Sequence, residues 1–187
     1  MKFCSLCGHA LTRRVPPGDR LERDVCDHCG QIEYQNPKVV VGCVPEWEGR
    51  IVMCRRAIQP RLGYWTFPAG FLELDETMAE GAARETFEES GVRVEIDRLL
   101  AVMDVPEIGQ VHVVYGGRAC SADPHPTDET SEVALMAEAD IPWDEIAFPS
   151  IYHGLKYFFA DRARGQWSVH TRRLTSRWKR AGAKLSD

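Results

Sequence analysis

A helix with both of its ends encoded locally is the strongest structural constraint in this 187-residue chain. Thr77 and Glu80 have the spacing of a capping box, in which the Thr77 hydroxyl accepts a hydrogen bond from the Glu80 amide and the Glu80 carboxylate accepts one from the Thr77 amide. Gly91 fits the left-handed position that ends many helices. We therefore expect a helix between residues 77 and 91. Its buried side is expected to come from the apolar residues Met78, Ala79, Ala82, Ala83 and Phe87.

Three carboxylates lie along one stripe of this helix. Each residue of an α-helix turns by about 100°, so Glu85, Glu88 and Glu89 fall within roughly 100° of arc. Like charges at this spacing destabilise a helix by about 0.2–0.5 kcal/mol per pair, so the stripe predicts a compensating cation. Carboxylate oxygens favour hard divalent ions, above all Mg²⁺ or Mn²⁺. Upstream, the apolar run from Trp65 ends in the bend 68–70, where a glycine lets the backbone approach a ligand or metal.

The spacing of Gly70, Glu76 and the segment 84–92 resembles the signature of the Nudix hydrolases. That signature is a glycine, five residues, a glutamate, seven residues and then Arg-Glu-U-x-Glu-Glu-x-Gly-U, where U is a bulky apolar residue. Every charged and glycine position matches, and the one departure is Thr86 at the first U position, where a β-branched residue can still pack. The resemblance implies an enzyme that hydrolyses the pyrophosphate bond of a nucleoside diphosphate derivative.

The same resemblance implies a set of ligands for magnesium or manganese. Glu85 and Glu89 would be the main ligands, Glu88 would add to the shell, and the carbonyl of Gly70 would be a further ligand. These metal ions would offset the charge that develops on the phosphate and would activate water.

Other acidic and basic residues would support the reaction. In the family pattern, Arg84 would orient a carboxylate of the signature, first of all Glu85, and Glu76 would brace the loop before the helix. The general base stays open, because in this family it is a signature glutamate or a glutamate on a later loop. This chain offers Glu129 and Glu132 there, although acidic loop residues are usually only solvated.

A second metal site is encoded near the N-terminus. Two Cys-x-x-Cys-Gly motifs start at Cys4 and Cys26 and are separated by 18 residues. Each motif turns two sulfurs towards one ion, so we expect a structural, closed Zn²⁺ site made of Cys4, Cys7, Cys26 and Cys29. The alternative is two disulfides or redox pairs, but the first residues do not resemble a secretory leader and no thioredoxin-like strand–helix pattern surrounds either pair. His9 and His28 are expected to be exposed, because four cysteines already close the site.

The order of strands and helices predicts an α/β fold. Strands are expected at 39–44 and 50–54, joined by a hairpin at Glu48-Gly49, then near Trp65, within 92–105 and 110–120, and at 133–136. A second helix is expected over 151–164, with Ile151, Leu155, Phe158 and Phe159 facing inward. The resemblance implies a Nudix α/β/α sandwich with a small N-terminal zinc ribbon held by four cysteines. We divide the chain into a zinc ribbon (1–35), a Nudix hydrolase domain (36–164) and a basic C-terminal tail (165–187).

Substrate recognition is less constrained by the sequence. Cleavage between two phosphates requires positive groups, and stacking on a ring requires aromatic ones. The candidate contacts are Arg55, Arg56, Arg118, Tyr64 and Phe67, with Arg61, Trp65 and Tyr115 as further possibilities. One or two of the arginines are expected to serve, and aromatic residues on strands more often belong to the core.

A zinc ribbon ahead of a Nudix domain resembles two groups of enzymes. NADH pyrophosphatases carry Ser-Gln-Pro-Trp-Pro-Phe-Pro after the signature, and the equivalent segment 104–110 lacks it. The group that includes ADP-ribose and FAD pyrophosphatases is the better match, with Trp-Thr-Phe-Pro-Ala-Gly-Phe at 65–71 and Ile-Ala-Phe-Pro-Ser at 146–150. ADP-ribose or FAD is therefore the expected substrate type, with NADH as the alternative.

Composition and charge suggest the compartment and the partners. No apolar run approaches the ~20 residues of a membrane span, and the remaining cysteines, Cys43, Cys54 and Cys120, are expected to be reduced core residues of a cytoplasmic protein. The net charge is -5, yet residues 162–187 carry eight Arg or Lys against one Asp. This tail, with Trp167 and Trp178, is expected to be a solvated terminus, although contact with nucleic acid is not excluded. A homodimer is expected from the resemblance. The alternative to an enzyme is a non-catalytic regulator that senses a nucleotide or binds nucleic acid.

Overall fold

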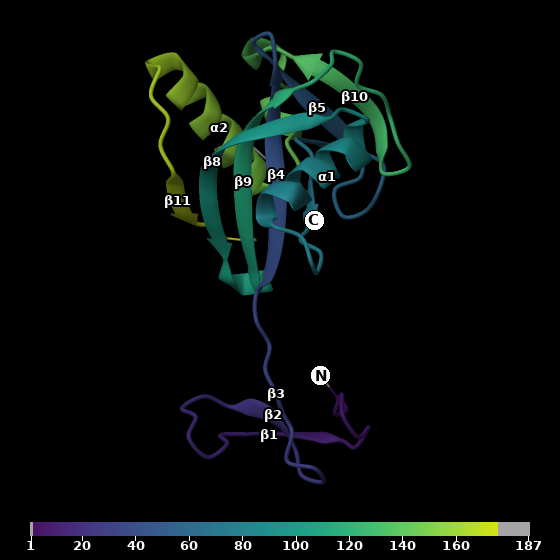
Figure 1. Cartoon of the computed structure of the whole chain (residues 1–187), viewed down its shortest axis with the longest axis vertical. Helices are drawn as coiled ribbons and strands as arrows, with labels where there is room; N and C mark the ends of the chain where they lie inside the picture. Colours follow the sequence, from purple (N-terminus) through teal and green to yellow (C-terminus); the bar gives the residue numbers. More distant parts are fainter. Residues whose placement is uncertain (1, 176–187) are drawn as a thin grey trace, which may run out of the picture. The chain divides into compact units, whose positions relative to one another are not determined.

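The structure is a computed structural model that describes residues 2–175. The chain divides into two compact units, with the boundary in the sequence between Asn36 and Pro37. Each unit has a β-sheet of its own (Figure 1).

The N-terminal unit is a small antiparallel sheet in the order β1-β2-β3. Its strands are β1 (Leu11–Arg14), β2 (Arg23–Cys26) and β3 (Ile32–Glu33). Both cysteine motifs form the same turn, because the amides of Cys4 and Cys26 each donate, at 2.8 Å, to the carbonyl five residues later. Gly8 and Gly30 then adopt left-handed conformations, with φ of 74° and 78°. These are the positions where the motif requires glycine.

The C-terminal unit is built on an eight-stranded mixed sheet. Its main path runs β10-β5-β4-β9-β8-β11, while β6 pairs with β5 and β7 pairs with β4. The β4–β9 and β8–β11 pairs are parallel and the others antiparallel. The strands are β4 (Lys38–Trp47), β5 (Arg50–Arg56), β6 (Trp65–Thr66), β7 (Ala69–Phe71), β8 (Val94–Val105), β9 (Gln110–Ala119), β10 (Thr130–Met136) and β11 (His170–Arg173). The predicted hairpin is confirmed, since Glu48 and Gly49 join β4 to β5 with φ of 47° and 80°, as in a type I′ turn.

Two helices cover opposite faces of this sheet (Figure 1). They are α1 (Met78–Ser90) and α2 (Pro149–Arg164), and three short 3₁₀ helices are η1 (Pro106–Ile108), η2 (Glu138–Asp140) and η3 (Trp143–Glu145). On β9, Val113 packs in a cluster with Ala82 of α1, whereas the next residue, Val114, packs in the main core with Leu155 and Phe158 of α2. Successive strand residues face opposite sides, so the predicted α/β/α sandwich is confirmed. The four inward residues expected on α2 are all buried.

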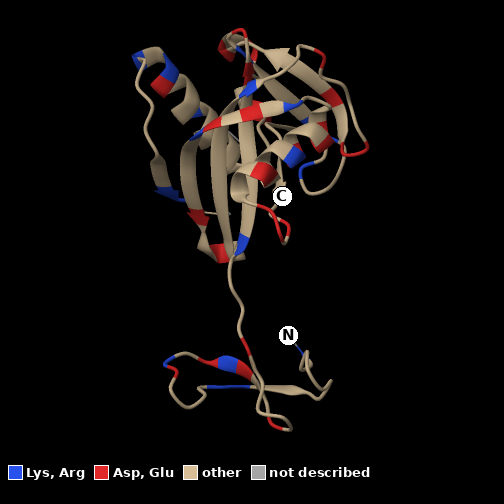
Figure 2. Ribbon diagram, in the orientation of Figure 1, with Lys and Arg blue, Asp and Glu red and all other residues tan. Residues whose placement is uncertain are grey.

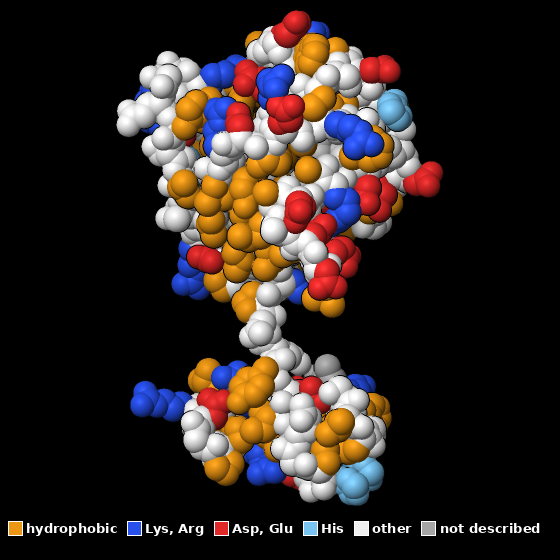
Figure 3. Space-filling model, in the orientation of Figure 1, with side chains coloured by type: hydrophobic (Ala, Val, Ile, Leu, Met, Phe, Trp, Pro, Cys, Tyr) orange, Lys and Arg blue, Asp and Glu red, His pale blue; other side chains and the backbone are white. Residues whose placement is uncertain are grey.

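The face of the sheet on the α1 side is covered only in part. Apolar side chains gather there over β8, β9 and β4 (Figure 3). The partly buried residues around the Val41–Ala82 cluster are Val39, Leu72, Val94, Ile96, Leu99, Val111 and Tyr115.

Helix α1 begins and ends as its sequence predicts, but its buried side differs from the expectation. The capping box at Thr77 is present, and Gly91 ends the helix with φ of 71°. Met78 and Phe87 are 42% and 46% exposed, so assigning them to the buried side was wrong. The residues that face inward include Gly81, Ala82, Glu85, Thr86, Glu89 and Ser90. The carboxylate stripe is thus largely the packed side, because Ala69 and Gly70 of β7 lie over it.

The segment expected to be a basic tail begins with a strand of the main sheet. Residues 170–173 form β11, which pairs in parallel with residues 101–104 of β8. Asp161, fully buried at the end of α2, anchors this return, because its carboxylate accepts hydrogen bonds from the Ser168 amide at 3.0 Å and from His170 Nε2 at 2.9 Å. Trp167 stacks on the Arg98 guanidinium, 3.8 Å from the ring centre. Trp178 and the most basic part of the tail lie outside the described residues.

The structure also bears on the expectations about the three remaining cysteines and about membrane spans. Cys43 and Cys54 are buried as expected, but Cys120 is exposed because it directly follows the end of β9. Among residues 2–175, no helix has the length and apolar character needed to cross a membrane.

Candidate active site

A cavity of about 690 Å³ opens at the ends of β4, β7 and β9, beside α1 and the start of α2. This volume lies within the range of roughly 300–1,000 Å³ that is usual for small-molecule sites. The charged residues in its lining include Arg56, Arg61, Glu85, Glu88, Glu89 and Glu129. Acidic residues, coloured red in Figure 2, also occur on α1 and in the loop before it.

The Glu85 carboxyl group lies directly against the backbone of Gly70. A Cβ atom at position 70 would overlap the carboxyl carbon and both oxygens of Glu85. Arg84 Nη1 donates to Glu85 Oε1 at 2.8 Å. Burial nevertheless raises the pKa of Glu85 above its usual value, because the loss of hydration outweighs this ion pair.

Glu89 is buried more deeply, with 4% of its surface exposed. Its Oε2 accepts a hydrogen bond from the Ala69 amide at 3.1 Å. Burial raises the pKa of Glu89 to about 8, since neither the Ala69 amide nor the charge of Arg56 compensates for the lost hydration, and the negative charge of Glu85 adds to the effect. In the part of the chain that the structure describes, the hydrogen bonds and ion pairs give Glu89 no basic side chain as a direct partner.

Arg84 joins the loop before α1 to the carboxylates of the helix. Its Nε and Nη2 donate to the two oxygens of Glu76 at 3.0 and 2.7 Å, and its Nη1 donates to both Glu85 and Glu88 at 2.8 Å. The Glu73 amide also donates to Glu76, at 2.9 Å. The Arg84 guanidinium holds the pKa of Glu76 at about 2, so this carboxylate stays ionised.

These donor groups fit a hard divalent cation. Glu85 and Glu89 bring buried carboxyl groups with raised pKa values to Gly70 and Ala69 of β7, and Glu88 is exposed in the last turn of the helix. A bound cation stabilises the ionised form of such buried carboxylates, and oxygen donors select Mg²⁺ or Mn²⁺ over softer metals.

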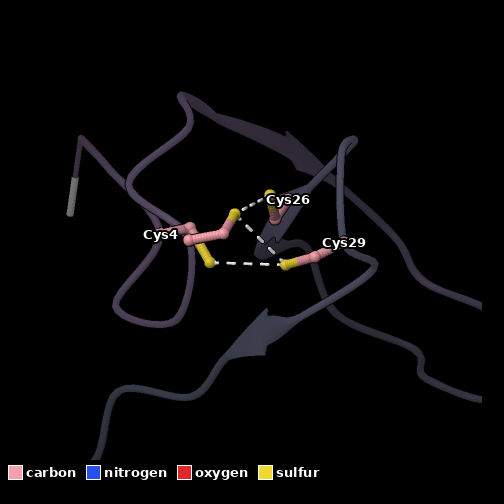
Figure 4. A group of neighbouring side chains, drawn as sticks. Cys4, Cys26 and Cys29 are labelled. Carbon is pink, nitrogen blue, oxygen red and sulfur yellow. Dashed lines mark hydrogen bonds between the residues drawn. The ribbon is translucent and has the colours of Figure 1, made fainter.

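The cysteine motifs of the N-terminal unit bring their sulfurs to one point (Figure 4). Cys7 Sγ lies 3.5 Å from that of Cys26 and 3.4 Å from that of Cys29, and Cys4 Sγ lies 3.6 Å from that of Cys29. Sulfurs around zinc, at Zn–S distances of about 2.3 Å, are roughly 3.8 Å apart, whereas a disulfide bond is about 2.05 Å long. The four cysteines are free thiols grouped as zinc ligands are, and disulfide pairing is not what the structure shows. The exposed rings of His9 and His28 stack on each other, 3.8 Å apart.

Both units match known family profiles. Residues 2–35 match the zinc ribbon described as Nudix N-terminal, and residues 36–159 match the NUDIX domain. The chain belongs to the Nudix hydrolase family.

Individual relatives agree with this assignment. The MutT-like protein of Streptomyces ambofaciens is 35% identical over 102 residues, which is 54% of this chain and 64% of that protein. Phosphatase NudJ of Escherichia coli strain K12 is 32% identical over 98 residues, 49% of this chain and 63% of that protein. The chain thus spans less than two thirds of the length of either relative.

Solved structures resemble the chain over more of its length. A Nudix hydrolase from Nitrosomonas europaea has a TM-score of 0.90 and 47% identity, covering 94% of this chain and all of that one. An ADP-ribose pyrophosphatase from Streptococcus suis has a TM-score of 0.61 and 19% identity, covering 73% of this chain and 99% of that one. The second likeness shows the fold alone.

The cavity distinguishes candidate residues that line it from candidates that do not, which the sequence alone could not do. Glu129 lines it and acts electrostatically on Glu85 and Glu89, whereas Glu132 is not in its lining and pairs with Arg55 at 3.4 Å. Arg56 lines it as well. Arg55 points to Glu132 and to the Gly63 carbonyl instead, because neighbouring residues of a strand face opposite sides. Arg55 and Glu132 therefore lie outside this lining and form an ion pair with each other.

Three further substrate candidates lie elsewhere. Phe67 is fully buried in the main core, where no ligand can reach it. Arg118 pairs with Glu95 and lies six residues beyond His112 on β9, about 20 Å along the strand. Tyr64 packs against the cavity-lining Arg61, with its ring centre 5.5 Å from the guanidinium, but is not one of the lining residues. The expectation that these side chains contact substrate is not supported.

Other cavity residues were missed by the sequence reasoning. They include Gln110 and His112 on β9, and Phe148 and Ser150 at the start of α2. The alternation of polar Gln110 and His112 with Val111 and Val113 was a signal that one face of this strand is polar. No local pattern indicated that α2 would begin at the same cavity.

Proposed function

We propose that this protein hydrolyses the pyrophosphate bond of a nucleoside diphosphate derivative with Mg²⁺ or Mn²⁺, and that ADP-ribose or FAD is its substrate type. The observation that carries the proposal is the pair of buried carboxyl groups, Glu85 and Glu89, that meet at the bend 69–70 and line the cavity. Two such groups without a metal ion would only destabilise the fold, since each loses its hydration.

The chain's own residues divide the work by position. Arg84, held by Glu76, fixes the orientation of Glu85 and Glu88, so the ligand oxygens are placed before metal and substrate arrive. Arg56 and Arg61 bring positive charge to the cavity and attract the diphosphate. A bound Mg²⁺ or Mn²⁺ supplies charge neutralisation on the phosphate and lowers the pKa of its bound water.

Glu129 is the proposed general base among the later glutamates. It lines the cavity and interacts electrostatically with Glu85 and Glu89, whereas Glu132 is held by Arg55. An exposed carboxylate near a water molecule polarised by metal can accept its proton. Glu129→Gln is expected to lower kcat, and Glu132→Gln serves as the matched control.

A substrate panel tests the activity directly. The full-length protein is incubated with ADP-ribose, FAD, NADH, coenzyme A and dinucleoside polyphosphates in the presence of Mg²⁺. We expect ADP-ribose to give AMP and ribose 5-phosphate, or FAD to give AMP and FMN. Glu85→Gln and Glu89→Gln are expected to lower the rate by orders of magnitude while the fold is kept, and Glu138→Gln, on the exposed η2, is the control. Binding of a panel member without turnover would instead support a nucleotide-sensing regulator.

The proposal also includes a structural zinc ion, a homodimer and a cytoplasmic location. The four grouped cysteines support a structural Zn²⁺ in the ribbon. The partly covered apolar face over β8, β9 and β4 supports a homodimer, which light scattering of the purified protein would test. Free thiols at all seven cysteines fit a cytoplasmic protein.

A further inference from the structure

Three uncharged polar side chains form a hydrogen-bonded row on the cavity wall. His112 lies at its centre, with Nδ1 2.9 Å from the Ser150 hydroxyl and Nε2 2.9 Å from Gln110 Oε1. Gln110 and His112 are two residues apart on β9, so both side chains leave the same face of the sheet. Ser150 comes from the first turn of α2. All three residues line the cavity that holds the glutamates.

The row has one direction. Burial lowers the pKa of His112 to about 4, so its ring is neutral at pH 7 and carries one N–H donor and one acceptor nitrogen. Gln110 Oε1 can only accept, so the hydrogen is on His112 Nε2, and Nδ1 accepts from the Ser150 hydroxyl. The row therefore fixes the carboxamide of Gln110 and leaves its NH₂ group as the donor that a ligand can use.

The register of the sheet sets the distance from this row to the glutamates. His112 lies opposite Val40 on β4, and Val40 lies opposite Phe71 on β7, the residue after Gly70. Two interstrand spacings of about 4.8 Å place the Cα atoms of His112 and Phe71 about 10 Å apart. In a nucleoside diphosphate one ribose separates the base from the diphosphate, so a single ligand can reach both ends of the cavity.

The surroundings of the row are apolar. Val105 pairs with Gln110 across β8 and β9, and the side chains of Ile108, Ile151 and Leu174 complete this part of the lining. The charged lining residues belong to other elements, namely α1, the last residue of β5, the loops after β5 and β7, and the loop before β10. An apolar wall with a few fixed, uncharged donors suits a flat, uncharged ring.

We propose that Gln110, His112 and Ser150 form the base subsite of this enzyme, in which Gln110 Nε2 donates a hydrogen bond to a ring nitrogen or carbonyl oxygen of the substrate's heteroaromatic base. His112 and Ser150 are positioning residues, because they act through Gln110. The inference rests on the proposed pyrophosphatase function. It sets the orientation of the substrate in the cavity, with the base at β9 and the diphosphate at α1.

A different use of the same row is inconsistent with its chemistry. Serine, histidine and a third residue in a row can form a nucleophilic triad, but the base of such a triad needs a pKa near the working pH. Burial holds the pKa of His112 near 4. Gln110 is neutral and cannot stabilise an imidazolium ion as a carboxylate does. Ser150 is therefore a hydrogen-bond donor in this site and not a nucleophile.

Binding of mononucleotides to the full-length protein tests the subsite without turnover. AMP, FMN and nicotinamide mononucleotide are compared with ribose 5-phosphate by calorimetry in the presence of Mg²⁺. We expect at least one mononucleotide to bind more tightly than ribose 5-phosphate. Gln110→Leu should weaken the binding of that mononucleotide by about 10-fold, the equivalent of one lost hydrogen bond. The affinity for ribose 5-phosphate should not change. Gln166→Leu, an exposed residue outside the cavity, is the matched control.

Steady-state kinetics provides the second readout. Gln110→Leu should raise KM by about 10-fold with kcat within about 2-fold of wild type. Ser150→Ala should shift KM in the same direction, because it removes the hydroxyl that holds the His112 ring through Nδ1. The subsite would be overturned if Gln110→Leu lost the same affinity for the mononucleotide and for ribose 5-phosphate, or if it kept the wild-type ratio of the two affinities. Gln110-dependent mononucleotide binding with no turnover of the substrate panel would support the subsite and refute the hydrolase function.

Discussion

Glu85 and Gly70 are in contact, and the carboxyl group of Glu85 occupies the space where any other residue at position 70 would place its Cβ. The glycine of the signature therefore has a steric role. It lets a helix carboxylate reach the backbone of β7 at the point where that strand borders the cavity.

Gly70→Ala should lower kcat by about 100-fold, because misplacing a reacting or ligating group by about 1 Å can have an effect of that size. The substitution leaves every charge in place, so the loss would come from displacement of Glu85 or of the residue 70 carbonyl, which is itself an expected metal ligand. Activity and thermal unfolding are measured side by side. Gly116→Ala, whose new Cβ would have the Arg98 side chain as its nearest neighbour at 3.1 Å, is the control and should keep its activity. Full activity in Gly70→Ala would contradict the steric role.

The raised pKa of Glu89 predicts how the metal-free protein responds to pH. Burial raises this pKa from 4.5 to about 8. As the pH rises, Glu89 loses its proton in the unfolded chain before it does so in the folded protein. The free energy of unfolding is therefore highest below about pH 4.5 and declines between there and pH 8, by up to roughly 1.4 kcal/mol per pH unit. Glu89→Gln removes this decline. Urea unfolding of both proteins between about pH 5 and pH 9, without added divalent metal, should give curves that separate as the pH rises. Parallel curves would mean that Glu89 is ionised throughout.

Metal binding should be coupled to the same proton. Because a ligating carboxylate must be ionised, Mg²⁺ binding to wild type should release protons and become tighter as the pH rises towards 8. Calorimetry in buffers with different ionisation enthalpies measures the number of protons released. If no protons are released near pH 7, Glu89 is either already ionised or not a ligand.

Arg84→Lys should lower both activity and stability. Lysine cannot replace the paired hydrogen bonds from the Arg84 guanidinium to Glu76 while also reaching Glu85 and Glu88. We expect the free energy of unfolding to fall by about 2 kcal/mol, the scale of a hydrogen bond to a charged group, together with a lower kcat. A double-mutant cycle with Glu76→Gln should show coupling between residues 76 and 84. Additive effects would show that the pair does not act as a unit.

The ribbon should contain one zinc ion per chain when the protein is purified under reducing conditions. Cys4→Ser should release it, because three thiolates leave the shell incomplete. Metal analysis gives the stoichiometry, and hydrogen exchange should show loss of protection in residues 2–35 while the Nudix domain stays protected. Wild-type protein that lacks zinc but keeps a protected ribbon would show that the metal is not structural.

The features that the sequence determined by itself are local. The capping box and Gly91 place the ends of α1, the two cysteine motifs form identical turns, and Glu48-Gly49 joins β4 to β5. Each depends on hydrogen bonds or backbone angles within about five residues, which residue type and spacing encode directly.

Only the tertiary structure decided which side chains reach the cavity. Arg56 lines it and the adjacent Arg55 does not, because strand register turns neighbours to opposite faces. Phe67 is a core residue although Thr66 and Ala69, one residue before it and two after it, line the cavity.

The row of Ser150, His112 and Gln110 shows the same limit most clearly. Its two ends lie 40 residues apart in the sequence and meet only because α2 packs on the face of the sheet to which β9 turns its polar side chains. Such contacts depend on how whole elements pack against one another, and no short stretch of sequence specifies that packing.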